Sequence, residues 1–397
     1  MRLKNNLSLL SSIILLCALL PIYPISAVTN EEESVLRTIY CSSADEIQNA
    51  LRSAEAGDRI IIKEGSYVGK WMEKGYFTSN AQGTKEHPIT IESENLNNPS
   101  ELVGLRSSSG YALYLTGDYW RVSNLKITNA QKGIMIDNGN YNIISGCQVY
   151  AVEQEGIHLR DGSSNNIIKN TKVYDTGTVR PDYGEGIYIG SDKGKWSEFK
   201  KECDNNIITN CEIGPNVGAE HLDIKEGTTG TVIEDCIFNG EGISGKNYAD
   251  SFIDVKGNKT VVRNNIGYRN KNLIIVDAFQ IHVQVDGWGL DNEFYDNHLY
   301  LDIAEVNILN NSKGTATVYN NKRYPDGNMY IGNNKVLDFK VEDLNRDGVV
   351  DLMDLSLVSK EYNKTSDING FSRSSDLNND GIIDIYDLVL ISKSINI

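Results

Sequence analysis

The chain has 397 residues, enough for one large hydrophobic core and a small additional module. Hydrophobic residues make up 40% and aromatic residues 8% of it, as in globular proteins, and the formal net charge is −16. This charge argues against a nucleic-acid or anionic-membrane binder, because like charges repel. A polyanionic substrate is less firmly excluded, since bound cations can reverse the local field.

The first residues predict an export signal. Arg2 and Lys4 form a basic start, residues 7–20 are mostly apolar, and small residues precede an expected cleavage near Ala27. The alternative is a membrane anchor, but the apolar run is too short to span a bilayer comfortably. We therefore expect residues 1–27 to be a signal peptide and the protein to be secreted and extracellular, with no membrane partner.

Residues 43–54 predict a short amphipathic helix that caps one end of the fold. Five cysteines remain once the signal peptide is removed, namely Cys41, Cys147, Cys203, Cys211 and Cys236. This odd number does not suggest a disulfide framework, although export would permit one.

A repeated segment dominates the middle of the chain. Its copies place β-branched pairs after Asn or Thr and occur at residues 141–147, 165–171, 205–211, 230–236 and 259–265. Each copy is accompanied by a second short strand, at residues 133–136, 156–159, 186–189, 221–224 and 252–255. The repeat length of about 23–35 residues is typical of a solenoid. The period of two in the strands excludes a helical solenoid.

These features predict a parallel β-helix, in which equivalent residues of successive coils stack at about 4.8 Å. One such column contains Cys147, Thr171, Cys211, Cys236 and Asn265, which we interpret as small residues that point into the core. Residues 57–62 (GDRIII) and 83–91 (GTKEHPITI), with the Asn-rich repeats, resemble the pectate-lyase superfamily of right-handed β-helices. The resemblance implies a catalytic β-helix domain over residues 28–335, on a fold that hosts lyases, hydrolases and non-enzymes.

Charged residues follow one set of strands in the predicted β-helix. Alternation places Asp223 and Lys225 outside on one coil, together with His221. The next coil places Phe252, Asp254 and Lys256 at the same positions, and earlier coils place there Tyr188, His158 and Arg160. An acid precedes each of three strands, at Glu155, Glu185 and Glu220.

Stacked acids repel one another unless something lies between them. We therefore expect a calcium ion bound by Glu185, Glu220 and Asp223. The alternative is a solvated charged face with local ion pairs, such as Asp223 with Lys256.

This set of groups suits β-elimination on a uronic-acid polysaccharide. Calcium would neutralise the uronate carboxylate, and Lys225 would remove the C5 proton if nearby positive charge lowers the pKa of Lys225. Lys256, Arg160 or a water molecule would protonate the departing oxygen. The segment from Glu220 to Lys225 is similar to the chondroitinase B and alginate lyase family, which implies a calcium ligand at Glu220 and a base at Lys225. That family has an Arg where this chain has Lys256.

Other side chains near this face are expected to have supporting roles. His158 and His282 are interpreted as ordinary surface or edge histidines. Trp196, Trp288 and Tyr248 lie in insertions between coils that would form the walls of a sugar cleft. Asp250 is placed within reach of the metal.

Two segments near the C-terminus have the spacing of an EF-hand calcium loop, with Gly348 and Gly381 at the sharp turns. Two calcium ions are therefore expected. The predicted ligands are Asp343, Asn345, Asp347, Val349, Asp351 and Asp354 in one loop and Asp376, Asn378, Asp380, Ile382, Asp384 and Asp387 in the other, with Val349 and Ile382 using their backbone carbonyls.

Asp at the last loop position and the lack of a helix before each loop match the type I dockerin, which residues 336–397 resemble. The resemblance implies a small all-α module that docks onto a cohesin domain through Leu352, Met353, Ile385 and Tyr386. A calcium site that only stabilises the chain end is the alternative.

The sequence thus predicts an all-β right-handed parallel β-helix with a dockerin, acting as a calcium-dependent lyase in a cellulosome-type complex. Its expected substrate is a pectate-type plant cell-wall polymer or another uronic-acid polysaccharide. Two alternatives stay open. A glycoside hydrolase would use Asp223 with Asp254 or Asp250, and a non-catalytic subunit would only bind carbohydrate.

Overall fold

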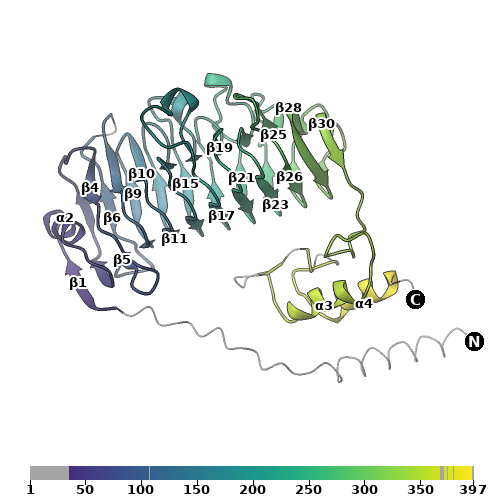
Figure 1. Cartoon of the computed structure of the whole chain (residues 1–397), viewed down its shortest axis with the longest axis horizontal. Helices are drawn as coiled ribbons and strands as arrows, with labels where there is room; N and C mark the ends of the chain where they lie inside the picture. Colours follow the sequence, from purple (N-terminus) through teal and green to yellow (C-terminus); the bar gives the residue numbers. More distant parts are fainter. Residues whose placement is uncertain (1–34, 107, 367–370, 373, 379, 396–397) are drawn as a thin grey trace, which may run out of the picture. The chain divides into compact units, whose positions relative to one another are not determined.

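The computed structural model describes residues 35–397 except 107, 367–370, 373, 379 and 396–397. The predicted signal peptide lies outside the described residues. Among the described residues, no helix has the length and apolarity needed to cross a membrane. Strands wind as a solenoid with parallel pairing between successive coils (Figure 1).

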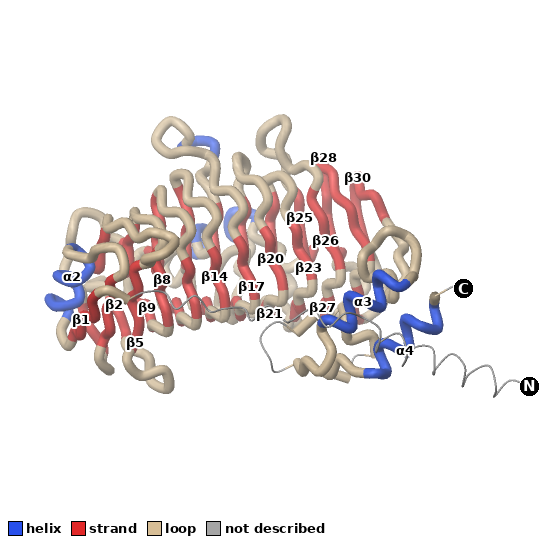
Figure 2. The backbone as a smooth tube through the Cα atoms, turned by 60° about the horizontal axis from the view of Figure 1, so that its bottom comes forward, coloured by secondary structure: helices blue, strands red, loops and turns tan. Residues whose placement is uncertain are grey.

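The coils build three parallel ladders, which appear as successive red segments joined by loops in Figure 2. The first ladder contains β4 (Gly75–Ser79), β7 (Tyr111–Leu115), β10 (Lys132–Asp137), β13 (Ile157–Arg160), β16 (Ile187–Ile189), β19 (Leu222–Ile224), β22 (Ile253–Val255) and β25 (Asp277–Ile281). The second contains β1 (Arg37–Cys41), β2 (Asp58–Ile62), β5 (Ile89–Ser93), β8 (Trp120–Ser123), β11 (Ile143–Ser145), β14 (Ile167–Lys169), β17 (Ile207–Thr209), β20 (Val232–Glu234), β23 (Val261–Arg263) and β26 (Asn292–Tyr295).

The third ladder contains β3 (Ser66–Val68), β6 (Glu101–Val103), β9 (Lys126–Thr128), β12 (Gln148–Tyr150), β15 (Lys172–Tyr174), β18 (Glu212–Ile213), β21 (Ile237–Asn239), β24 (Ile266–Tyr268), β27 (His298–Tyr300) and β29 (Lys322–Tyr324). The long strand β28 (Asn307–Tyr319) pairs with both β25 and β26 and joins the first two ladders, and β30 (Tyr330–Val336) pairs with β28.

The predicted repeats are confirmed. The Asn-rich segments contain β11, β14, β17, β20 and β23, and the accompanying strands are β10, β13, β16, β19 and β22. Aliphatic residues of successive coils stack inside the first ladder, where all of them are fully buried: Ile134, Ile157, Ile187, Leu222 and Ile253. Each such side chain contributes about 1.5–3 kcal/mol by leaving water.

Asparagine occurs both at positive-φ positions and in the buried inward column between the second and third ladders. Asn170, Asn210 and Asn264 adopt positive φ angles of 51–56°, which Asn tolerates better than most residues. Their neighbours Cys211 and Asn265 lie in the predicted inward column, which is buried. All five cysteines among the described residues are buried and free.

The predicted cap is α2 (Ala44–Arg52), which begins where the Ser43 hydroxyl accepts a hydrogen bond from the Glu46 amide. Ile47 and Leu51 are fully buried against the first coils, so the helix covers the apolar end of the solenoid (Figure 1). Short 3₁₀ helices η1 (Pro181–Tyr183), η2 (Lys193–Lys195) and η3 (Lys246–Tyr248) lie in the insertions between coils.

The C-terminal module has its own small core. Helices α3 (Leu352–Lys360) and α4 (Ile385–Ser394) begin at Asp351 and Asp384, each with a capping box. Apolar residues of both repeats form one buried cluster: Val350, Val358, Ile383, Leu388 and Ile391. The predicted domain limits of 28–335 and 336–397 stay predictions.

We expect Asn206→Ala to lower the free energy of unfolding by about 3 kcal/mol, because the change leaves several buried backbone groups unpaired. The buried Asn206 amide donates to the carbonyl oxygens of Ser163 and Cys203 and accepts from the Asn166 amide. Scanning calorimetry should show a lower melting temperature for this variant and little change for Thr209→Ala, which alters a half-buried outward residue. Equal stability of the two variants would contradict the structural role of the Asn206 side chain.

Candidate active site on the first ladder

Outward side chains of the first ladder stack in register on successive coils. Tyr188, Asp223, Asp254 and Gln280 occupy equivalent positions of β16, β19, β22 and β25. The acids that precede the strands form what we call the acid column, Glu155, Glu185 and Glu220. The predicted stacking of Asp223 with Asp254 is therefore confirmed.

His221 and Phe252 do not lie on this outer face, and their predicted exposure is wrong. His221 is fully buried and packs against the rings of Phe238 and Phe252, at centroid distances of 5.6 and 5.5 Å. Its Nε2 lies 3.0 Å from the Asn239 carbonyl oxygen. Both residues precede the regular strands β19 and β22, so the alternation of strand side chains does not extend to them.

Two lysines lie at the centre of the outer face. Lys256 Nζ is 2.6 Å from Asp223 Oδ1 and 2.6 Å from Asp254 Oδ2. Lys225 Nζ is 3.3 Å from Asp223 Oδ2, 3.7 Å from Asp192 Oδ2 and 5.2 Å from the Tyr188 ring centroid. The alternative ion pair between Asp223 and Lys256 therefore exists, but both side chains are buried rather than solvated.

The electrostatics of Lys225 differ from those expected. Burial alone would lower the pKa of Lys225, but the carboxylates of Asp223, Glu226 and Asp192 outweigh it and raise the pKa. Lys256 has a raised pKa for the same reason, with Asp223 and Asp254 opposing the effect of burial. The protein's own groups therefore do not meet the condition that positive charge lowers the pKa of Lys225.

The acid column carries buried carboxyl groups with few partners. Glu185 and Glu220 are 5% and 7% exposed, and the Glu185 Oε2 atom has no hydrogen-bond partner among the described residues. Burial, with repulsion from Asp223 and Asp254, raises the pKa of Glu220 to about 8. Burial, with repulsion from Glu155, Asp223 and Glu220, raises the pKa of Glu185 well above its usual range. These groups hold a proton or need a cation.

Asp223 fits the predicted calcium site poorly, because one oxygen contacts Lys256 and the other contacts Lys225. Asp250 likewise accepts a hydrogen bond from Gln280 at 2.7 Å. The described residues contain no preformed group of three or more His, Cys, Asp or Glu side chains able to hold a metal. Glu185 and Glu220 still fit a cation that takes further oxygen ligands from substrate and water.

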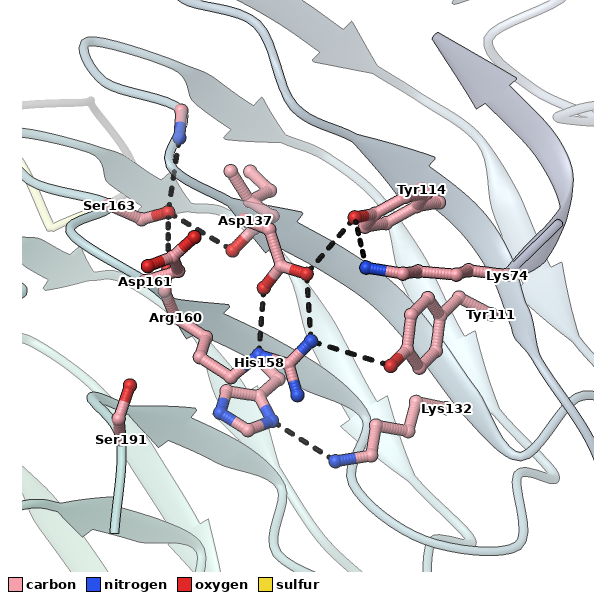
Figure 3. Close-up of polar contacts among 12 residues, drawn as sticks. Lys74, Tyr111, Tyr114, Lys132, Asp137, His158, Arg160, Asp161, Ser163 and Ser191 are labelled. Atoms are coloured by element: carbon pink, nitrogen blue, oxygen red, sulfur yellow. Dashed lines mark hydrogen bonds and ion pairs between the residues drawn. The ribbon is translucent and has the colours of Figure 1, made fainter. Parts of the chain in front are cut away.

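Arg160 lies two coils before Lys225 and is held by Asp137 (Figure 3). Arg160 Nε and Nη2 donate to the two Asp137 carboxylate oxygens at 2.8 and 2.7 Å, and its guanidinium lies 3.9 Å from the Phe199 ring centroid. Asp137 and Tyr111 outweigh burial and raise the pKa of Arg160 further. A guanidinium held in this way is a poor proton donor, which weakens Arg160 among the three candidates for protonating the departing oxygen.

His158 is not a surface histidine. It is buried, and its Nδ1 lies 3.2 Å from Lys132 Nζ (Figure 3). The same nitrogen is 3.5 Å from Glu155 Oε1. Burial and Lys132 lower the pKa of His158 to about 4, so its ring is neutral near pH 7. Burial opposes ionisation of Glu155, but Lys132 and His158 prevail and lower its pKa to about 2. Only the fold brings Lys132 to this cluster.

His282 is partly exposed, as expected of an edge histidine, and it has a charged partner. Its Nδ1 lies 2.9 Å from Asp254 Oδ1, which connects it to the two lysines through Asp254 and Asp223. The repeat itself carries this signal, because Ile281 and His282 occupy the same column as Ile224 and Lys225, two coils further on.

The insertions contribute side chains beside this face. Lys201 Nζ lies 5.5 Å from the Trp196 ring and 5.7 Å from the Trp288 ring, so two insertions distant in sequence meet. Lys193 Nζ also donates to the Gln284 backbone carbonyl at 3.0 Å. Tyr248 is 86% exposed on η3. A separate hollow of about 430 Å³ is lined by Lys172 and Glu212 of the third ladder, and its lining does not include Lys225 or Lys256.

The C-terminal loops have the features of the predicted calcium sites. Asp343 Oδ1 is buried with no hydrogen-bond partner among the described residues, as expected for a cation ligand. Gly348 has φ 92°, a conformation that side-chain-bearing residues rarely adopt. Asp354 and Asp387 are buried and each accept three backbone hydrogen bonds from their loop. Leu352, Met353, Ile385 and Tyr386 are exposed, as docking would require.

Comparison with known proteins identifies relatives of both parts. An alginate lyase from Paenibacillus sp. str. FPU-7 is 51% identical, with a TM-score of 0.73 over 75% of this chain and 99% of that one. Pectate lyase L from Dickeya chrysanthemi is 23% identical over 71% of this chain. This chain spans 60% of the length of that relative. The structure of pectate lyase Pel9A, at 15% identity and a TM-score of 0.53, shares the fold over 77% of this chain and 79% of its own.

These relatives are pectate and alginate lyases, in agreement with the expected polysaccharide lyase. Residues 27–273 match the family described as Pel9A-like, right handed beta helix region. Residues 341–396 match the type I dockerin domain, a calcium-binding module. The chain therefore belongs to the Pel9A-like right-handed β-helix family and ends in a type I dockerin domain.

Proposed function

We propose that the chain is a secreted lyase that cleaves an alginate-type uronic-acid polysaccharide by calcium-assisted β-elimination. The observation that carries this proposal is a continuous series of alternating charges on the first ladder, Lys225, Asp223, Lys256, Asp254 and His282. The 51% identity to an alginate lyase moves the first expected substrate from pectate to alginate.

The two lysines have different roles in this proposal. Lys256 is fixed by two carboxylates at 2.6 Å each, so it serves as a permanent positive charge facing the substrate carboxylate. Such a preorganised charge stabilises the negative charge that develops when the C5 proton leaves. Lys225, which is bound less tightly at 3.3 Å, is the base that accepts this proton.

Lys225 needs additional positive charge nearby before it can act as a base, because its neighbouring carboxylates raise its pKa. Calcium, when bound, would neutralise the uronate carboxylate and supply that charge. Glu185 and Glu220 would hold the ion, since both are buried and stacked and the Glu185 Oε2 atom has no hydrogen-bond partner among the described residues. Asp223 would stay with the lysines and bind the ion only indirectly.

The dockerin supports a place in an extracellular, cellulosome-type complex. Its exposed apolar residues at loop positions 10 and 11 would contact a cohesin domain, and its two loops would each bind one calcium ion.

Hydrolysis is the second candidate, and Glu220 is the observation that favours it. A carboxyl group with a pKa of about 8 is a suitable general acid, and Asp254 beside it is ionised because Lys256 and His282 outweigh burial and lower its pKa. The two reactions give different products, since only elimination creates an unsaturated sugar end.

We expect polymannuronate or polyguluronate treated with the full chain and calcium to gain ultraviolet absorbance from unsaturated ends, more than polygalacturonate does. Lys225→Ala should lower this rate by at least about 100-fold, because it removes the base. Lys172→Ala, which alters an exposed ion pair on the third ladder, is the matched control. Reducing ends without absorbance would indicate the hydrolase, and neither signal on any polymer would indicate a binding subunit.

We expect the calcium-free chain to lose stability as the pH rises through the titration of Glu220. The pKa of Glu220 increases on folding from 4.5 to about 8, so the unfolded chain releases this proton first. The free energy of unfolding therefore falls between about pH 4.5 and 8 and stays lower above pH 8. In chelator, the melting temperature of Glu220→Gln should fall less over this pH range than that of the unaltered chain. Glu212→Gln alters an exposed residue of the third ladder and should behave like the unaltered chain. Parallel curves for Glu220→Gln and the unaltered chain would contradict this.

We expect calcium to be required for the dockerin but not for the β-helix fold. Chelation should unfold α3 and α4, because the buried carboxylate of Asp343 and its equivalents lose the calcium ion that they bind. It should also abolish binding to an immobilised cohesin. Circular dichroism and cohesin pull-down would show this. The double variant Met353→Asp/Tyr386→Asp should keep the calcium-dependent helix signal while binding cohesin more weakly; unchanged binding would move the docking surface elsewhere.

A further inference from the structure

A long insertion between β16 and β17, residues 190–206, runs along one edge of the first ladder. The Lys200 side chain donates to Asn138 Oδ1, directly after β10, at 2.7 Å. The Lys193 side chain donates to the Gln284 carbonyl oxygen, after β25, at 3.0 Å. The coils of β10 and β25 are five strand spacings apart, about 24 Å along the solenoid axis. The insertion therefore reaches across six successive coils.

Hydrogen bonds fix this insertion at both of its ends. Ser191 Oγ donates to the Lys200 carbonyl oxygen at 3.0 Å, which closes the loop on itself. The Lys193 amide donates at 2.8 Å to Oε1 of Glu226, a fully buried residue. The Lys200 amide donates to Asp161 Oδ1 at 2.9 Å. The side chains of the insertion therefore have defined positions beside the ladder.

Lys201 lies where this insertion meets the insertion that follows β25. Its Nζ is 5.5 Å from the Trp196 ring centroid and 5.7 Å from the Trp288 ring centroid. The Trp196 indole is oriented by its Nε1, which donates to the Ser191 carbonyl oxygen at 3.0 Å. A Cβ on Gly227, which has φ 95°, would lie 2.8 Å from Lys201 Cβ, so glycine permits this close approach. Lys201 and both tryptophans remain partly exposed.

Three lysines of the insertion carry a charge that no carboxylate neutralises. Lys193 and Lys200 contact neutral oxygens, and Lys201 contacts the two indole rings. None of the three forms an ion pair within the described part of the chain, whereas Lys195 pairs with Glu198 at 2.8 Å. In a chain with a net charge of −16, such a positive edge favours the approach of a polyanion.

We propose that Lys201, between Trp196 and Trp288, binds the carboxylate of a uronic-acid residue in a subsite beside the first ladder. This inference rests on the proposed uronic-acid substrate and does not depend on how the glycosidic bond breaks. The ammonium pairs with the sugar carboxylate through charge-assisted hydrogen bonds. The exposed part of each indole packs against the apolar C–H face of a sugar ring. Because the indoles hold the ammonium without cancelling its charge, Lys201 selects charged sugars over neutral ones.

The test measures binding of the full chain, with calcium, to polymannuronate and to the same polymer with its carboxylates reduced to alcohols. Affinity electrophoresis in gels that contain the polymer in large excess gives a Kd that turnover does not alter. Lys201→Gln should raise the Kd for polymannuronate about 10-fold, the loss expected for one charge-assisted contact, and leave the Kd for the reduced polymer unchanged.

Three further variants separate charge from packing. Lys201→Arg keeps a cation between the rings and should restore most of the affinity for polymannuronate. Trp288→Ala removes a packing surface and should weaken binding of both polymers. Lys195→Gln removes the same charge from the same insertion, at an exposed residue paired with Glu198, and is the matched control.

The outcomes distinguish the subsite from the reaction. Equal Kd values of Lys201→Gln and the unaltered chain for polymannuronate would overturn the subsite while the lyase function stands. Equal losses on the charged and the reduced polymer would also overturn it, because Lys201 would then only hold the tryptophans in place. Binding that depends on Lys201 without any unsaturated ends would overturn the lyase reaction and leave the subsite standing. A chain that binds neither polymannuronate, polyguluronate nor polygalacturonate would overturn the proposed substrate and this inference together.

Discussion

In-register parallel stacking is the constraint on which the rest of this structure depends. Each coil lies one strand spacing from the next, so whatever a position carries on one coil faces its equivalent on the neighbouring coils. Inside the solenoid this brings Ile187, Leu222 and Ile253 together and builds the core. Outside, the same geometry brings charges into contact that water would otherwise separate.

The first ladder meets this constraint in two ways. Asp223 and Asp254 stack as like charges, and Lys256 lies between them with 2.6 Å contacts to both. In the acid column, Glu155 forms an ion pair with Lys132, whereas Glu185 and Glu220 form none within the described part of the chain. Burial and neighbouring carboxylates raise the pKa values of Glu185 and Glu220. The unpaired part of the face is where a cation or a substrate gains most, because an existing electrostatic cost is removed on binding.

The regular coils fix the spacing of side chains, whereas the insertions vary in length. The ladders hold Lys225, Lys256 and His282 at fixed spacing on successive coils. The insertions bring Trp196 and Trp288 together around Lys201 without disturbing the coils, because loops at solenoid edges can lengthen freely. The dockerin folds around its own core of Val358, Ile383 and Ile391, so attachment and chemistry remain separate functions of one chain.

The sequence by itself determined the solenoid, its repeats, the capping helix and the two calcium loops, because these depend on local periodicity and spacing. It also identified the columns of Asp223 with Asp254 and Lys225 with Lys256, since the repeat carries their register. Only the tertiary structure decided which groups pair. Side-chain directions and dielectric surroundings decide the burial of His221 and the ion pairs of Asp223 with Lys225 and Lys256. They also decide the pairing of Asp137 with Arg160 and of His282 with Asp254. Those properties arise from contacts between coils and have no counterpart in a linear pattern.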